Sequence, residues 1–109
     1  MISEQIRQRF LRDPLPVQLG GLAADLARIA SFSDNPKNAT AVASLLEEGK
    51  YFAEWIAPVA SLDTQALLAD VQRMLASWEQ QWRRGAPVPA MQVEAARKSE
   101  ELLAVAGLA

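Results

Sequence analysis

The stretch "VASLLEEGKYFAEWIAP", from Val42 to Pro58, decides the fold because its apolar residues recur at helical spacing. Successive members of this apolar seam are separated by three, four, three and four positions: Val42, Leu45, Gly49, Phe52 and Ile56. An α-helix turns by about 100° per residue, so these positions share one face, with Leu46 and Ala53 beside it. The stretch therefore predicts an amphipathic helix that buries this seam and ends before Pro58.

The three aromatic residues of this stretch do not share one face. Phe52 lies in the seam and is expected in the core, whereas Tyr51 and Trp55 form an i, i+4 pair elsewhere on the helix. Either another helix covers that pair, or it stays exposed as an anchor for a partner. Gly49 costs a helix up to about 1 kcal/mol relative to alanine. We expect that it lets another helix or a bulky side chain approach closely.

Residues that interrupt helices divide the rest of the chain into helical segments. Breaks are expected at 13–16, 33–36, 58–61 and 85–89, where proline, glycine, aspartate and serine gather. Five helices follow, over about 3–12, 17–32, 36–57, 61–84 (starting at Ser61 or Asp63) and 90–106. Ser3 is the expected N-cap of the first. Gly85 and Gly107 are the expected carboxyl-terminal glycines of the last two, with Leu108 folding back on Leu103.

The predicted fold class is all-α, in one domain of 109 residues. No stretch alternates apolar and polar residues as a strand does. The short connections favour a compact bundle of four to five antiparallel helices. We expect the third and fourth helices to form a central long-helix hairpin against which the second and fifth pack.

The fourth helix repeats the seam spacing and carries two tryptophans. Its apolar residues again follow at intervals of three and four: Leu68, Val71, Leu75, Trp78 and Trp82. Both tryptophans are therefore expected in the core. Trp82 also lies near the helix end beside Arg83 and Arg84, where these three side chains could edge a pocket.

Composition argues against several kinds of chemistry. The chain has no histidine and no cysteine, which removes the commonest general base, thiol nucleophiles and the usual zinc ligands. We therefore expect no catalytic residue, no metal site and no cofactor. Charges mostly pair along helices, for example Asp25 with Arg28 and Lys50 with Glu54. The adjacent acids Glu47 and Glu48 point about 100° apart and are expected to be solvated.

Charge and hydropathy also bear on partners and location. The net charge is −2 with no long basic block, so no nucleic acid is expected. No apolar run approaches the roughly 20 residues that span a bilayer, and the first residues lack a secretory apolar core. We expect a cytoplasmic protein that does not bind membranes. A weaker alternative is that the basic first helix, with Arg7, Arg9 and Arg12, engages anionic lipid or RNA.

Two stretches, "LPVQLGGLAADLARIASFS" and "LLEEGKYFAEWIAP", resemble a family of small, all-helical, uncharacterised cyanobacterial proteins. The tryptophan-rich fourth helix and the end at 106–108 belong to the same resemblance. It implies a helical fold and a cytoplasmic location, and it brings no activity with it.

The sequence thus predicts a non-catalytic helical module that binds itself or another protein. The contact surface would be the Tyr51/Trp55 face or apolar surface left on the outer helices. The alternative is a small-molecule binding protein, with a pocket edged by Trp82, Arg83 and Arg84 or a notch at Gly49.

Overall fold

The computed structural model describes residues 2–86 and 88–108, and all regular structure in them is helical. The elements in chain order are α1 Glu4–Arg12, α2 Leu15–Phe32, η1 Pro36–Asn38, α3 Ala39–Ile56, η2 Ala57–Val59, α4 Leu62–Arg83 and α5 Met91–Ala106. The two η elements are single 3₁₀ turns on either side of α3. The predicted all-α class is confirmed.

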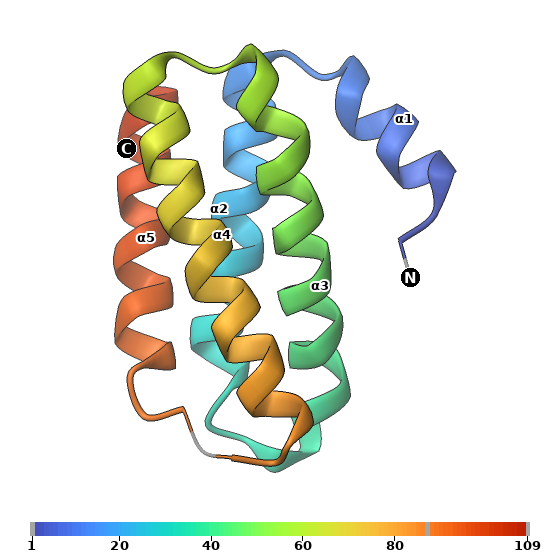
Figure 1. Cartoon of the computed structure of the whole chain (residues 1–109), viewed down its shortest axis with the longest axis vertical. Helices are drawn as coiled ribbons and strands as arrows, with labels where there is room; N and C mark the ends of the chain where they lie inside the picture. The colour runs from blue at the N-terminus through green and yellow to red at the C-terminus, as the bar shows by residue number, and fades with distance from the viewer. Residues whose placement is uncertain (1, 87, 109) are drawn as a thin grey trace.

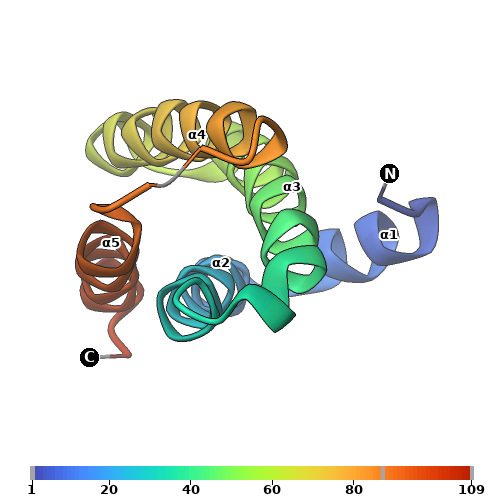
Figure 2. The same ribbon diagram turned by 90° about the horizontal axis from the view of Figure 1, so that it is seen from below.

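Four of the helices form an up-down-up-down bundle (Figure 1). Seen along the bundle, α5, α2, α3 and α4 follow one another around a ring (Figure 2). The α3–α4 hairpin is present, and α2 packs closely against both α3 and α5. Contact between α4 and α5 is slight, so α5 is held mainly by α2, and the expectation that it packs against the α3–α4 hairpin was wrong. The hydroxyl of Ser99 on α5 donates a hydrogen bond of 2.8 Å to the carbonyl of Ala23 on α2.

Helix α1 stands outside this bundle, beside α3 (Figures 1 and 2). Its one buried residue among those described is Phe10. The Phe10 ring stacks on Phe52 of α3 with centroids 4.1 Å apart, and one edge lies over Gly21 of α2. Phe10 therefore anchors α1 on α2 and α3, and the half-buried Ile6 also packs against the core.

The predicted seam of α3 lies in the core. Val42, Phe52 and Ile56 are buried, Leu45 is half-buried, and the flanking Leu46 and Ala53 are buried. A Cβ atom on Gly49 would lie 3.0 Å from Leu75 Cδ1 of α4, so the expected close approach is confirmed.

The two tryptophans of α4 differ in environment. Trp78 is buried as predicted. Trp82 is only half-buried, so its placement in the core was wrong. It lies in the last turn of α4, where the α2–α3 and α4–α5 connections flank it instead of another full helix.

The helix ends follow from local side chains. Ser3 accepts a hydrogen bond from the backbone N–H of Ile6, and Ser61 accepts one from Thr64, each at 3.2 Å. Helix α2 begins at Leu15, two residues earlier than predicted, because Pro16 fits the first turn of a helix.

Both expected carboxyl-terminal glycines are confirmed. Gly85 and Gly107 adopt left-handed conformations, with φ of 71° and 76°. The N–H of Leu108 donates to the Leu103 carbonyl at 2.9 Å, as a Schellman end requires. The Leu108 side chain, however, lies against Gly20 of α2.

Three amide side chains hold the connections at the helix ends. Gln18 donates to the carbonyl of Phe10 at 3.2 Å and to that of Asp13 at 3.0 Å. Gln65 holds the α3–α4 connection through two carbonyls of η2 and its flank. Asn38 donates to Phe32 at 3.3 Å and so closes the α2–α3 connection. These bonds satisfy carbonyl groups that a helix end leaves without partners.

Candidate functional site

Large apolar side chains gather on the surface at one end of the bundle. The α1–α2 connection, the α3–α4 connection and the carboxyl end of α5 lie together there (Figure 1). Six of the seven exposed large apolar residues in the described ranges belong to these element ends. We name this group the apolar end: Leu11, Val17, Val59, Leu62, Val105 and Leu108. The seventh, Val93, lies in the first turn of α5 at the opposite end of the bundle.

The aromatic pair Tyr51/Trp55 is half-buried, and α1 provides its cover. The Trp55 ring centroid lies 5.7 Å from that of Phe10, 5.9 Å from that of Phe52 and 5.7 Å from that of Tyr51. Trp55 therefore belongs to an aromatic cluster inside the chain. Tyr51 is at the edge of this cluster and borders a cavity of about 210 Å³ with Lys50, Glu54 and Gln72.

A pair of carboxyl groups meets between α2 and α3. The Asp25 side chain is 1% exposed, and Glu48 of α3 is the acidic group nearest to it in effect. Burial, followed by hydrogen bonding to Glu48 and the charge of Glu48, raises the pKa of Asp25 to about 8 against the weaker opposing effect of Arg28. Asp25 is therefore mostly protonated at neutral pH.

This pair corrects two expectations from the sequence. Asp25 does contact Arg28 at 3.3 Å, but as a buried group and not as one half of a solvated pair. Glu48 is half-buried against Asp25, so its assignment as a solvated acid was wrong. The carboxyl oxygen Oδ2 of Asp25 is buried and has no hydrogen-bond partner among the described residues.

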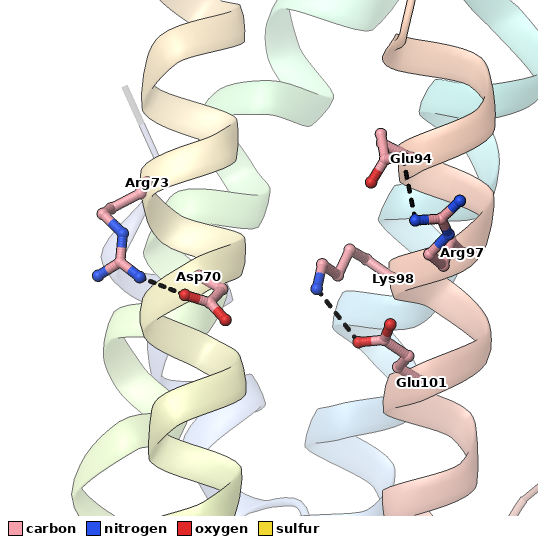
Figure 3. Close-up of polar contacts among 6 residues, drawn as sticks. All are labelled: Asp70, Arg73, Glu94, Arg97, Lys98 and Glu101. Carbon is pink, nitrogen blue, oxygen red and sulfur yellow. Dashed lines mark hydrogen bonds and ion pairs between the residues drawn. The ribbon is translucent and has the colours of Figure 1, made fainter.

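The ion pairs shown in Figure 3 stay within single helices. They are Asp70–Arg73 in α4 and, in α5, Glu94–Arg97 at 3.3 Å and Lys98–Glu101 at 3.2 Å. Each joins residues three positions apart in one helix. Lys98 is the least exposed of the six, at 19%, and extends toward α4 in Figure 3. Because both partners of each pair belong to the same helix, none of the three pairs links α4 to α5.

One ion pair joins two helices. Lys50 Nζ on α3 lies 2.5 Å from Glu79 Oε1 on α4, and not beside Glu54 as expected. Arg83 Nη2 lies 3.7 Å from the other oxygen of Glu79. The half-buried Lys50 and the nearly buried Glu79 thus help to hold the hairpin, and Arg83 belongs to this cluster.

Trp82 borders a cavity of about 350 Å³. The α2–α3 and α4–α5 connections form its other walls, at the end of the bundle opposite the apolar end. The described lining residues are Ser33, Asp34, Pro36, Ala39, Trp82, Gly85 and Ala86. A second cavity of about 270 Å³ shares Ser33, Asp34 and Trp82 with it. Cavities of this size are within the range of small-molecule sites.

The polar atoms of this cavity are of three kinds. Trp82 Nε1 donates a hydrogen bond of 3.0 Å to the Ala39 carbonyl, which fixes the indole. The Ser33 hydroxyl oxygen is buried and has no hydrogen-bond partner in the described part of the chain. Asp34 is exposed at the rim, and within residues 2–86 and 88–108 its carboxylate forms no ion pair.

The two arginines expected beside Trp82 lie differently. Arg83 is turned toward Glu79 and borders a separate cavity of about 160 Å³ that Trp82 also lines. Arg84 is exposed at the carboxyl end of α4, next to Gly85. The walls of the Trp82 cavity instead include Ser33 and Asp34, which were expected only to interrupt a helix.

The described residues offer limited scope for other chemistry. No group of three acidic, histidine or cysteine side chains in them is placed to hold a metal ion. No described helix has the length and apolar character needed to cross a bilayer.

Comparison with protein-family models, with curated proteins and with solved structures finds no match to this chain. The two features of the molecule that bear on its function are therefore the apolar end and the Trp82 cavity.

Proposed function

We propose that this chain is a non-catalytic helical module that associates with a second copy of itself through the apolar end. The observation that carries the proposal is the gathering of six exposed apolar side chains at that end. Leu62, the first residue of α4, is 82% exposed, and Val59, at the end of η2 just before it, is 62% exposed. Several large apolar side chains exposed at one end of a molecule favour an interaction site there.

A second copy is the occupant that fits this surface best. In a two-fold dimer the same patch meets itself, so an apolar surface finds an apolar partner without any further requirement. The patch draws on four of the five α-helices, and three of these, α2, α4 and α5, belong to the bundle. Each Å² of apolar surface buried in the dimer would contribute roughly 25 cal/mol to the free energy of association.

The Tyr51/Trp55 face supports self-association less well than the apolar end does. Trp55 already packs against Phe10 and Phe52, so much of its apolar surface is satisfied within the chain. We therefore place the contact at the apolar end.

A dilution series followed by ¹H–¹⁵N NMR tests this proposal. Amide resonances of Val17, Val59 and Leu62 should shift with protein concentration, while those around Val93 stay fixed. Shifts centred on Tyr51 and Trp55 would mean that the dimer uses the other face. A spectrum that does not change with concentration would contradict self-association.

A second candidate function is binding of a small molecule in the Trp82 cavity. The observation that favours it is a cavity of about 350 Å³ whose lining combines an indole ring with a carboxylate and a hydroxyl group that lack partners in the described chain. Mostly apolar walls with a few unpaired polar groups are characteristic of ligand sites.

A further inference from the structure

The residues that line the Trp82 cavity indicate which class of ligand it would bind. This inference rests on the second candidate function, small-molecule binding, and not on self-association. Three features decide it: the charge of the lining, the hydrogen-bonding capacity left unused, and the shape of the apolar wall.

The charge of the lining is negative. Asp34 is the one charged residue among the described lining residues of the cavity, and no cation in the described chain neutralises it. The basic residues nearest to the lining in sequence are Lys37, Arg83 and Arg84; all three are exposed, and Arg83 is turned toward Glu79. The cavity therefore offers an unpaired carboxylate to a bound molecule, which favours a cation.

The unused hydrogen-bonding capacity favours a cation that carries N–H groups. The Asp34 carboxylate is exposed and forms no ion pair in the described chain, so its oxygens can accept hydrogen bonds from a bound molecule. An ammonium group supplies both the charge and the donors that suit a carboxylate. The Ser33 hydroxyl oxygen also lacks a partner, but water cannot reach it, so we assign it no contact with the ligand.

The apolar wall fits a short chain of methylene groups. Trp82, Pro36 and Ala39 border the same cavity, and the bond from Trp82 Nε1 to the Ala39 carbonyl fixes the indole ring in place. An indole ring also attracts a cation through its face.

We propose that this cavity binds a primary alkylammonium ion, with its NH₃⁺ group on Asp34 and its alkyl chain along Trp82. The ligand keeps its charge and is not chemically changed. A free amine and the side chain of a lysine on another protein share this chemistry.

Three probes with similar chains separate charge from apolar contact: n-pentylammonium, pentan-1-ol and hexanoate. Each is titrated into ¹⁵N-labelled protein, with the Trp82 indole N–H as the reporter, assigned by its loss in Trp82→Phe. We expect pentylammonium to shift this signal and the Gly85 and Ala86 amides, with about tenfold tighter binding than pentanol. A peptide with one lysine then tests whether a protein-borne ammonium binds equally.

Asp34→Asn supplies the decisive variant, because Asp34 is exposed and its replacement leaves the core untouched. In this variant pentylammonium and pentanol should bind with about equal affinity. Asp63→Asn, which changes an exposed acid at the other end of the bundle, should keep the full preference.

The remaining outcomes distinguish an error in the ligand class from the absence of any small-molecule binding in the cavity. Equal binding of pentylammonium and pentanol to the unmodified protein would overturn the ligand class and leave the cavity as an apolar site. Tighter binding of hexanoate would overturn it in favour of an anion held by the neighbouring arginines. No response to any probe would overturn both the ligand class and the second candidate function.

Discussion

Asp25 places a carboxyl group inside the bundle, where it faces the carboxyl group of Glu48. Burial is the main reason that the pKa of Asp25 rises from 3.8 to about 8. Between these two pH values the folded protein holds a proton that the unfolded chain has lost. The stabilisation is therefore complete below pH 3.8 and is lost as the pH rises through about 8.

Asp25→Asn should remove this dependence of stability on pH. The asparagine side chain has the same shape and stays neutral, so the free energy of unfolding should no longer fall as the pH rises from 3.8 to about 8. The unmodified protein should lose up to about 1.4 kcal/mol per pH unit in that window. Urea denaturation across the window measures both slopes. Asp70→Asn, at an exposed ion pair, is the control and should keep the original slope.

Gly49→Leu should destabilise the fold. Even a Cβ atom would lie 3.0 Å from Leu75 Cδ1, so a full leucine side chain must displace the α3–α4 contact. Overpacking of this kind costs about 1–3 kcal/mol. The midpoint of chemical denaturation measures it, with Ala41→Leu at an exposed position of α3 as the control. Increased stability would mean that Gly49 does not pack against α4.

Single residues also show where sequence patterns stop being informative. Asp25 has a partner three positions on, Arg28, and that pattern is typical of a surface ion pair. A second signal pointed inward, because Gln18, Leu22, Asp25 and Ile29 follow at intervals of four, three and four and are all buried. The Lys50–Glu79 pair had no such signal, since periodicity within one helix does not reveal which residue of another helix faces it.

Among the elements, α1 is the least integrated, because Phe10 is its main attachment. Phe10→Ala should release α1 from the groove between α2 and α3 and leave the four-helix bundle folded. We expect a loss of about 3 kcal/mol in the stability of the α1 contact. Hydrogen exchange would report it as lost protection confined to 4–12. Gln8→Ala, at an exposed position of α1 outside the apolar end, is the control and should change little.

If Phe10→Ala instead unfolds α2–α5 together with α1, the first helix is an integral part of the bundle. If α1 simply detaches, Trp55 should also become more exposed to solvent, and its fluorescence should shift to longer wavelength. It follows because Phe10 and Trp55 are in contact.

The sequence located the elements better than it located their neighbours. Gly85, Gly107, Ser3 and Ser61 act locally, and each ended or began a helix as expected. Which helix packs on which depends on side chains far apart in sequence. The close pairing of α2 with α5 through Ser99 and Ala23 joins residues from opposite halves of the chain and was not foreseen in that form.

Across the whole molecule, the two ends of the bundle differ in character. One end exposes large apolar side chains, and the other holds the Trp82 cavity with the unpaired carboxylate of Asp34. The apolar end was foreseen only as leftover apolar surface. Its residues lie in four different helices and a connection, so their convergence becomes visible only once the chain is folded.

Self-association through the apolar end makes stability depend on protein concentration. Because dimer formation is linked to folding by mass action, the thermal midpoint should rise with concentration in the unmodified protein. It should become independent of concentration in Leu62→Glu. Calorimetry over a dilution series provides this measurement.

The most direct test of the central claim is sedimentation equilibrium on the unmodified protein, Leu62→Glu and Val93→Glu. Both residues are exposed and lie in the first turn of a helix, so each glutamate is tolerated alike by its own helix. The account predicts that the unmodified protein and Val93→Glu sediment as dimers of the 11.9 kDa chain, and Leu62→Glu as a monomer. A monomer in all three cases, or a dimer that Leu62→Glu leaves intact, would contradict it.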